Sequence, residues 1–330
     1  MRKIVHIFLT ISIILFIFVQ ESPNGQSSET YILIGMLSAS KNVHIRNFQR
    51  ELFKKAVFAS HVKASLVFVL GRPKNQKHWK KIAREKERFA DLFIADQVEN
   101  YGQLLSVGLN FISSYAANHL RSHSAKKKFY FKTDDDVFLR YSLLSLSISR
   151  LPAKSTYFGQ IAPNFHFYSP AQRNRMEYLH DTLPLFALGT GYGMSYDLVE
   201  AAASYKHAVI NSDSGYNFLN EDSGISVLFE RIGLRIENVI HFPGIYSFCL
   251  PKFSIKYCDT IAFHMGAKGH GAVGEVSKLD RLKEFNRKFG QFCLETTSTK
   301  SVNAHEIQNV SLSRLIASGC VSVTGQGKEL

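Results

Sequence analysis

The stretch KFYFKTDDDVF, residues 128–138, places three consecutive aspartates directly after an apolar run. Crowded carboxylates repel one another, and burying them is costly unless a positive charge balances them. Oxygen ligands of this type suit Mg²⁺ or Mn²⁺. An idle, solvated acidic turn is the alternative, but the apolar residues on both sides of Asp134, Asp135 and Asp136 favour a held site. The stretch therefore predicts a divalent cation site at the end of a buried strand.

The chain before the aspartates alternates apolar runs with amphipathic segments. Its spacing predicts strands at 31–40, 65–71 and 91–94, and helices at 44–60, 79–89 and 101–120. Near-continuous apolar strands separated by helices are typical of a mostly parallel sheet covered on both faces. Ligands bind such sheets beyond the carboxyl ends of the strands, which is where the aspartates are expected. Neither a GxGxxG nor a GxxxxGK[ST] motif occurs in the part of the chain before the aspartates.

The second half of the chain is less regular. Its pattern predicts strands at 156–161, 234–242 and 261–264, helices at 141–149, 196–205, 221–232 and 278–289, and a loop over a site at 164–181. Gly189, Gly191 and Gly193 alternate, which suits either a close approach of backbone to a ligand or a tight bend in the core. Glu221 and Asp222 open one predicted helix, where acids are usually partners of the helix dipole.

The composition is that of a globular protein. The 330 residues are 45% hydrophobic and 20% charged, enough for one large domain or two ordinary ones. The net charge of +13 favours anionic partners, but no nucleic-acid reading motif accompanies it, so no nucleic-acid partner is expected. The basic clusters at 77–88 and 278–288 are interpreted as helices with solvated faces.

The N-terminal segment predicts a secretory route. Three residues, Met-Arg-Lys, precede an apolar run at 4–19, which fits a short signal-anchor or a signal peptide with the rest of the chain in the lumen. No small-x-small cleavage pattern precedes Ser22, which favours an uncleaved anchor. We expect an anchor at 1–21, a short stem at 22–30, one folded domain at 31–294 and a polar tail at 295–330.

A lumenal location permits disulfides. The four cysteines allow three pairings, of which a short loop between the first two is our first expectation; they are Cys249, Cys258, Cys293 and Cys320. The sequon at Asn309 agrees with this location but is weak evidence alone.

The order of these motifs resembles glycosyltransferase family 31, the β-1,3-galactosyl- and N-acetylglucosaminyltransferases of the Golgi. The resemblance rests on HIRNFQRELF at 44–53, KTDDDVF at 132–138, GTGYGMS at 189–195, the Glu-Asp pair at 221–222 and a late histidine, His264. Only the aspartates are specific alone; the order and spacing of the motifs carry the rest. Two departures are Leu52-Phe53 in place of the family's Thr-Trp, and Ser223 and Ser226 in place of its usual valine and glycine.

The resemblance implies a single α/β domain of the GT-A type, a Rossmann-like fold with a mostly parallel sheet that binds nucleotide-sugars. It implies metal-dependent, inverting transfer of galactose or an N-acetylhexosamine from a UDP-sugar to a glycan hydroxyl, forming a β-1,3 linkage. It also implies a single-pass type II Golgi membrane protein that modifies glycoproteins or glycolipids, and it allows a homodimer. A catalytically weak or inactive relative, acting as a lumenal chaperone or glycan-binding protein, is the alternative; the complete aspartate triplet argues against it.

The same resemblance assigns roles to particular residues. Asp136 and His264 would bind Mn²⁺ or Mg²⁺. Asp222 would be the general base, with Glu221 as a positioning residue and second candidate. The expected donor-binding residues are Asp134, Asp135, Lys132, Arg46 and Arg50. For the two arginines, a structural salt bridge is an equally open interpretation.

Overall fold

The computed structural model describes residues 29–162, 183–205, 221–242, 244–246, 261–264 and 278–289. The predicted anchor, nearly all of the stem, the loop at 164–181, the four cysteines, the sequon and the polar tail lie outside these residues. Among the helices of the described part, none has the length and apolar character needed to cross a membrane.

The larger sheet of the described part has seven strands in the order β3-β2-β1-β4-β7-β6-β8. These strands are β1 (Thr30–Leu37), β2 (Val62–Arg72), β3 (Leu92–Val98), β4 (Lys127–Asp134), β6 (Thr156–Ala162), β7 (Phe186–Ser195) and β8 (Asn238–His241). Four of their pairings are parallel, and β7 runs antiparallel to both of its neighbours. The predicted mostly parallel sheet is therefore confirmed, as a mixed sheet.

A smaller sheet of three strands, in the order β5-β10-β9, follows the aspartates. It comprises β5 (Val137–Leu139), β9 (Ile245–Tyr246) and β10 (Ala262–His264). The helices are α2 (Val43–Lys54), α3 (Gln76–Arg88), α4 (Leu104–Phe111), α5 (Ala117–Ser122), α6 (Tyr141–Ser149), α8 (Tyr196–Ser204), α10 (Glu221–Arg231) and α11 (Lys278–Phe289). The single helix predicted at 101–120 includes a 3₁₀ turn (Tyr101–Gln103) and a π turn (Ile112–Ala116) on either side of α4.

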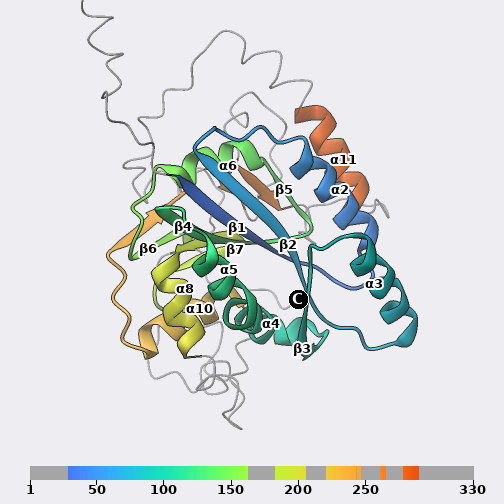
Figure 1. Ribbon diagram of the computed structural model, residues 1–330, viewed down its shortest axis with the longest axis horizontal. Coiled ribbons are helices and arrows are strands. Elements are labelled where there is room, and N and C mark those ends of the chain that lie inside the picture. Colours follow the sequence, from blue (N-terminus) through green and yellow to red (C-terminus); the bar gives the residue numbers. More distant parts are fainter. Residues whose placement is uncertain are drawn as a thin grey trace, which may run out of the picture.

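Helices cover both faces of the larger sheet (Figure 1). Along β1, Tyr31 and Leu33 pack into a cluster with α4, α5, α8 and α10, whereas Ile32 and Ile34 pack into a second cluster with α3, α6 and the small sheet. Successive side chains of a strand point to opposite faces, so only an uninterrupted apolar run can fill both cores. This is why the first strand has the sequence YILIGML.

The sequence did not predict β7, an inner strand whose glycines interrupt any apolar alternation. A Cβ on Gly191 would lie 2.6 Å from Phe131 Cζ, and one on Gly193 would lie 2.1 Å from Phe158 Cζ. Both glycines make room for aromatic rings of the neighbouring strands, so core packing explains them. A Cβ on Gly189 would face the carboxylate of Asp222 instead.

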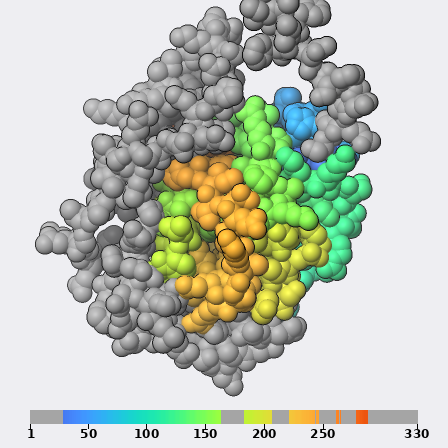
Figure 2. All heavy atoms as spheres, turned by 90° about the vertical axis from the view of Figure 1, so that its left-hand side faces the viewer, coloured from blue at the N-terminus to red at the C-terminus, as the bar shows by residue number. Residues whose placement is uncertain are grey.

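The edge of the larger sheet that β8 forms is partly exposed. There β8 pairs with β6, and its Val239 is 40% exposed. Figure 2 shows residues of this part of the chain, in orange, at the surface of that side of the molecule. The aspartates lie on an inner strand, away from this edge.

Candidate active site

The three aspartates lie where the parallel strands β1 and β4 end. Asp134 is in register with Leu37, the last residue of β1, and the amide of Asp135 donates to the Leu37 carbonyl at 3.0 Å. Asp136 then leads into β5. The prediction that the triplet occupies the carboxyl edge of the sheet is confirmed.

Asp135 is held by the segment that follows β1. Its Oδ2 accepts hydrogen bonds from Ser38 Oγ at 2.6 Å and from Asn42 Nδ2 at 2.8 Å. Gln49 donates to its backbone carbonyl at 3.1 Å. Burial raises the pKa of Asp135 to about 6 in spite of the two side-chain hydrogen bonds, which lower it. Asp135 thus joins the end of β1 to the end of β4.

Asp136 has two cationic or potentially cationic neighbours. His264 Nε2 lies 3.4 Å from its Oδ1, and Lys278 Nζ donates to its Oδ2 at 2.5 Å. Burial alone would raise the pKa of Asp136, but the hydrogen bond and charge of His264, with the charge and hydrogen bond of Lys278, lower it below its usual range. Asp136 is therefore the most strongly anionic of the three aspartates.

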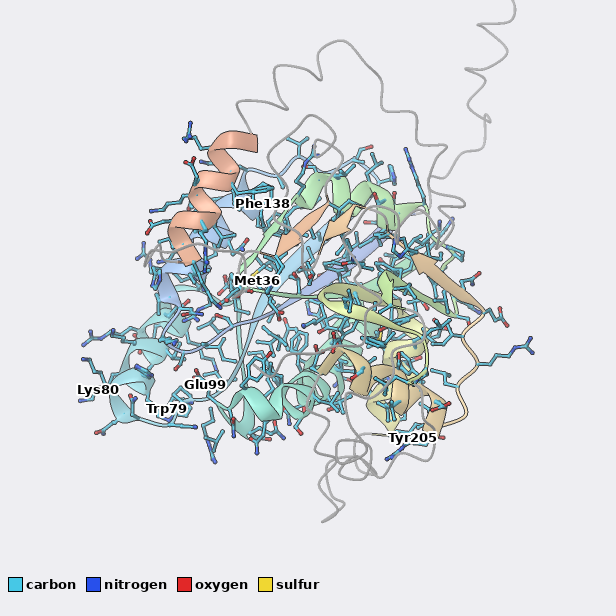
Figure 3. The ribbon with its side chains drawn as sticks, turned by 180° about the vertical axis from the view of Figure 1, so that it is seen from behind. Met36, Trp79, Lys80, Glu99, Phe138 and Tyr205 are labelled. Carbon is cyan, nitrogen blue, oxygen red and sulfur yellow. The ribbon has the colours of Figure 1, made fainter. Side chains whose placement is uncertain are left out.

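The packing of two elements brings these neighbours in. Strand β10 pairs antiparallel with β5, which sets His264 opposite Val137. Helix α11 packs on α2 and β5 through the buried Leu282 and through Phe285, whose ring centroid lies 4.9 Å from that of Phe138. Figure 3 shows Phe138 beside α11. Lys278, the first residue of α11, is thereby presented to Asp136.

Asp134, Asp136 and His264 form a group that could hold a metal ion. One potential ligand atom of each lies within 4.8 Å of those of the others. Two carboxylates and one imidazole suit Mn²⁺, and the oxygens suit Mg²⁺. The chemistry of this donor set therefore fits the implied cation. Asp134 stands in this group as well as Asp136 and His264, although the resemblance assigned it to the nucleotide.

Lys132 lies in β4, two residues before Asp134, and is almost fully buried. Its Nζ contacts Asp134 Oδ1 at 3.0 Å, Glu221 Oε2 at 2.9 Å and the Gly189 carbonyl at 3.0 Å. Burial opposes its charge, but the two carboxylates outweigh burial and raise the pKa of Lys132 above its usual value. The ammonium is therefore fully engaged with protein groups.

Glu221 and Asp222 open α10 as predicted, and the helix packs against β7. Glu221 is buried, with one carboxylate oxygen accepting from Tyr192 Oη and the other from Lys132. Asp222 accepts from the Gly189 amide at 3.0 Å and from the Ser223 amide at 2.9 Å.

The pKa of Asp222 is higher than a position at a helix N-terminus alone would make it. Burial raises it above the ordinary aspartate value, although Lys132 and the two amides lower it. A carboxylate at a helix N-terminus alone would be expected to have a lowered pKa. The upward shift makes Asp222 a stronger base, which is the direction that general-base catalysis needs.

Arg46 and Arg50 are paired with carboxylates of the protein. Arg46 is fully buried and donates to both oxygens of Glu85, at 2.8 and 2.6 Å, and to Ser38 Oγ at 2.9 Å. Arg50 binds Glu85 at 2.7 Å and both oxygens of Asp91 at 2.7 and 2.8 Å. These contacts favour the salt-bridge interpretation of the two arginines. Through Ser38, Arg46 also supports the segment that holds Asp135.

We expect Arg46→Met to lower the free energy of unfolding by about 3–5 kcal/mol, because the buried carboxylate of Glu85 loses one of its two arginine partners and keeps Arg50. Urea denaturation followed by circular dichroism measures this. The matched control is Arg121→Met, which removes the exposed ion pair with Glu200 and should scarcely move the midpoint. Equal shifts in the two variants would contradict a structural role for Arg46.

Sequence reasoning missed three groups around the site. Glu85 lies in a basic helix and looks like an ordinary surface acid. Tyr192 falls inside the glycine series. Lys278 is 142 positions from Asp136, in a cluster interpreted as solvated. None of the three carries a local sequence signal for its contact.

Comparison with known proteins assigns a family to these motifs. The family model described as galactosyltransferase matches residues 46–239, more than half of the chain. The matched region includes the aspartates, the glycine series and the Glu-Asp pair, and it ends before His264 and Lys278.

Curated relatives match at low identity. UDP-GalNAc:beta-1,3-N-acetylgalactosaminyltransferase 2 of Xenopus tropicalis is 27% identical over 154 residues, 46% of this chain and 29% of that protein. Probable beta-1,3-galactosyltransferase 13 of Arabidopsis thaliana is 26% identical over 196 residues, 57% of this chain and 51% of that protein. The matches thus span at most about half the length of these two relatives.

One solved structure, of the galactosyltransferase LgtC in complex with donor and acceptor sugar analogs, matches 79% of this chain and 96% of that chain. The sequence identity is 10% and the TM-score is 0.38. At this TM-score the likeness bears on neither the fold nor the function.

Proposed function

Because this chain belongs to the galactosyltransferase family, we propose that it transfers a hexose from a UDP-sugar to a hydroxyl of a glycan acceptor. We propose further that the transfer inverts the anomeric carbon and forms a β-1,3 linkage. The names of both relatives describe β-1,3 transfer by those proteins. Galactose and N-acetylhexosamines are the proposed donor sugars, and a glycan on protein or lipid is the proposed acceptor. The fold would be of the GT-A type.

One observation carries the proposal: contacts of a single lysine link a potential cation site to the partly buried carboxylate of Asp222. Lys132 contacts Asp134 of the cation group, and it contacts Gly189, whose amide holds Asp222. Glycosyl transfer needs a stabilised leaving group on one side of the sugar and a base on the other. This edge of the sheet offers both.

Asp134, Asp136 and His264 are the proposed metal ligands, for Mn²⁺ or Mg²⁺. When bound, the cation would neutralise the negative charge that develops on the UDP diphosphate as the sugar–phosphate bond breaks. Lys278 would compete with the cation for Asp136, since its ammonium binds the same carboxylate. Asp135 would hold the ends of β1 and β4 in place beneath the nucleotide.

Asp222 is the proposed general base, which takes the proton of the acceptor hydroxyl as its oxygen attacks the anomeric carbon. Two contacts support Asp222 over Glu221. The Glu221 carboxylate accepts from Tyr192 and Lys132 on its two oxygens and is buried, whereas Asp222 is less buried and its pKa is raised. Glu221 would then act as a structural partner of Lys132. Arg46 and Arg50 would stabilise the segments next to the proposed donor-binding residues.

A Golgi location, a type II membrane anchor at residues 1–21 and a homodimer remain parts of this proposal. The anchor would keep the folded domain in the lumen, where UDP-sugars and glycans meet. These parts rest on the sequence pattern and the family resemblance.

A donor screen tests the activity. The full chain is purified in detergent with Mn²⁺, and UDP release is measured with UDP-galactose, UDP-N-acetylgalactosamine and UDP-N-acetylglucosamine across a panel of glycan acceptors. We expect acceptor-dependent UDP release with at least one donor, and a β-1,3 linkage in the product by NMR. Absence of release with every donor and acceptor would overturn the proposal, and a retained anomeric configuration would overturn the inverting mechanism.

A further inference from the structure

Lys132 takes no part in the proposed chemical steps, although its contacts lie between the proposed cation site and the proposed base Asp222. The resemblance assigned it to donor binding. Its side chain is only 4% exposed, however, and its ammonium has three acceptors in the protein: Asp134, Glu221 and the Gly189 carbonyl. An ammonium has three N–H donors, so these contacts satisfy it completely. A donor phosphate would have to displace one of them.

The three acceptors of Lys132 come from three separate segments. Asp134 ends β4, Gly189 lies in β7 and Glu221 begins α10. Balancing one buried ammonium requires only one carboxylate. The extra acceptors mean that the lysine fixes the relative position of the strand that carries the aspartates, the neighbouring antiparallel strand and the helix that carries the base.

Gly189 passes this constraint on to Asp222. Its carbonyl accepts from Lys132 at 3.0 Å, and its amide donates to Asp222 Oδ2 at 3.0 Å. A Cβ added to Gly189 would lie 3.5 Å from that oxygen and 3.7 Å from Lys132 Nζ, so this residue sits directly between them. A shift of the Gly189 backbone would therefore move the Asp222 carboxylate.

We propose that Lys132 is a positioning residue that sets the base Asp222 at a fixed place relative to Asp134, by holding the Gly189 backbone and the start of α10. The proposal rests on the function proposed above and extends it to a residue that contacts neither donor nor acceptor. A misplaced reacting group of about 1 Å can cost about 10²-fold in rate, so the position of a base is worth such a device.

Charge balance alone is the competing explanation, and a double variant separates the two. Lys132→Met leaves the buried Glu221 and the partly exposed Asp134 without their cation and is expected to lose stability. Adding Glu221→Gln removes one of those charges, so that Lys132→Met/Glu221→Gln has the same net charge at this place as the wild type. The double variant still lacks the contact to the Gly189 carbonyl.

The matched control is Lys127→Met. Lys127 lies at the other end of the same strand and donates to the carbonyls of Ser149 and Leu151, both at 3.1 Å. It therefore reports what the loss of a lysine with backbone acceptors costs away from the site. We expect this control to retain wild-type kcat and KM.

The test compares thermal stability, kcat and the KM for the UDP-sugar in full-length protein, with hydrogen exchange of the peptide that covers Gly189 as a readout independent of turnover. For the double variant we expect a melting temperature near that of the wild type, kcat reduced about 10²-fold, donor KM changed less than about threefold and faster exchange at Gly189. Wild-type kcat in the double variant would overturn the proposal, because charge balance would then suffice. Loss of its fold would overturn it too, because Lys132 would then serve the fold alone.

Failure of the proposed function looks different from failure of this proposal. If the wild-type protein releases no UDP from any donor, the proposed function is wrong. If the wild-type protein turns over and the double variant matches it, only the role of Lys132 is wrong. Unchanged exchange at Gly189 in the double variant would also overturn the proposed link from Lys132 to Asp222.

Discussion

Asp222→Asn is expected to lower kcat by about 10²–10⁴-fold and to leave the KM for the UDP-sugar close to the wild-type value. The amide keeps the shape of the side chain, and its carbonyl oxygen can still accept from one of the two backbone amides, that of Gly189 or that of Ser223, so the site should stay assembled. It cannot take a proton from the acceptor hydroxyl. Steady-state UDP release with a saturating acceptor measures both constants, and circular dichroism checks the fold.

The pH profile makes the same prediction sharper. Burial raises the pKa of Asp222, so the base becomes protonated, and activity is lost, as pH falls through a value above the ordinary aspartate pKa of about 3.9. This acid limb of kcat/KM should disappear in the residual activity of Asp222→Asn. Glu221→Gln is the control, with a smaller loss of kcat and a retained acid limb. The reverse pattern would make Glu221 the base.

Asp136→Asn is the second change with a large expected effect. Outer-sphere partners of a metal ligand typically affect metal affinity 10–100-fold, so loss of a direct carboxylate ligand should weaken Mn²⁺ binding by about 100-fold or more and reduce UDP release comparably. Electron paramagnetic resonance of free Mn²⁺ in the presence of UDP measures the affinity. Chelation of the wild type should abolish turnover, and added Mn²⁺ should restore it. Unchanged affinity in Asp136→Asn would exclude this residue as a ligand.

Three further variants sort the roles around Asp136. Lys278→Met removes the ammonium that binds the same carboxylate, so Mn²⁺ should bind more tightly than in the wild type. Asp134→Asn should weaken Mn²⁺ binding, because Asp134 is a proposed ligand. A raised KM for the UDP-sugar with unchanged Mn²⁺ affinity would instead show that Asp134 contacts the nucleotide. Glu87→Gln, an exposed acid on α3, is the control and should change neither. Weaker Mn²⁺ binding in Lys278→Met would contradict competition between the lysine and the cation.

Local patterns were sufficient to predict most of the framework. The apolar run at the start of the folded part predicts a strand buried on both faces, and β1 packs into both cores. The helices α6 and α11 begin and end at the predicted residues, because helical periodicity depends only on neighbours along the chain. The site at the carboxyl edge of the sheet could be predicted from the same information. The direction of the chain identifies the carboxyl end of each strand, and parallel strands place these ends at the same edge.

The antiparallel strand β7 could not be predicted in this way. Its glycines fit against Phe131 and Phe158 from neighbouring strands, and its apolar residues show no strict alternation. What makes it a strand is the register of β4 and β6 on its two sides. Tertiary pairing overrides a weak local pattern here, as it commonly does for inner strands.

Local sequence patterns are enough to place three aspartates after a buried strand and a Glu-Asp pair at the start of a later helix. These patterns could not determine the partner of any of these charges. The packing of distant segments sets these pairs: Glu85 and Asp91 bind Arg46 and Arg50, Lys132 joins Asp134 to Glu221, and Lys278 binds Asp136. The two kinds of information differ in their range along the chain. Periodicity depends on adjacent residues, whereas an ion pair forms only where the packing of the two cores brings distant segments within about 4 Å of each other.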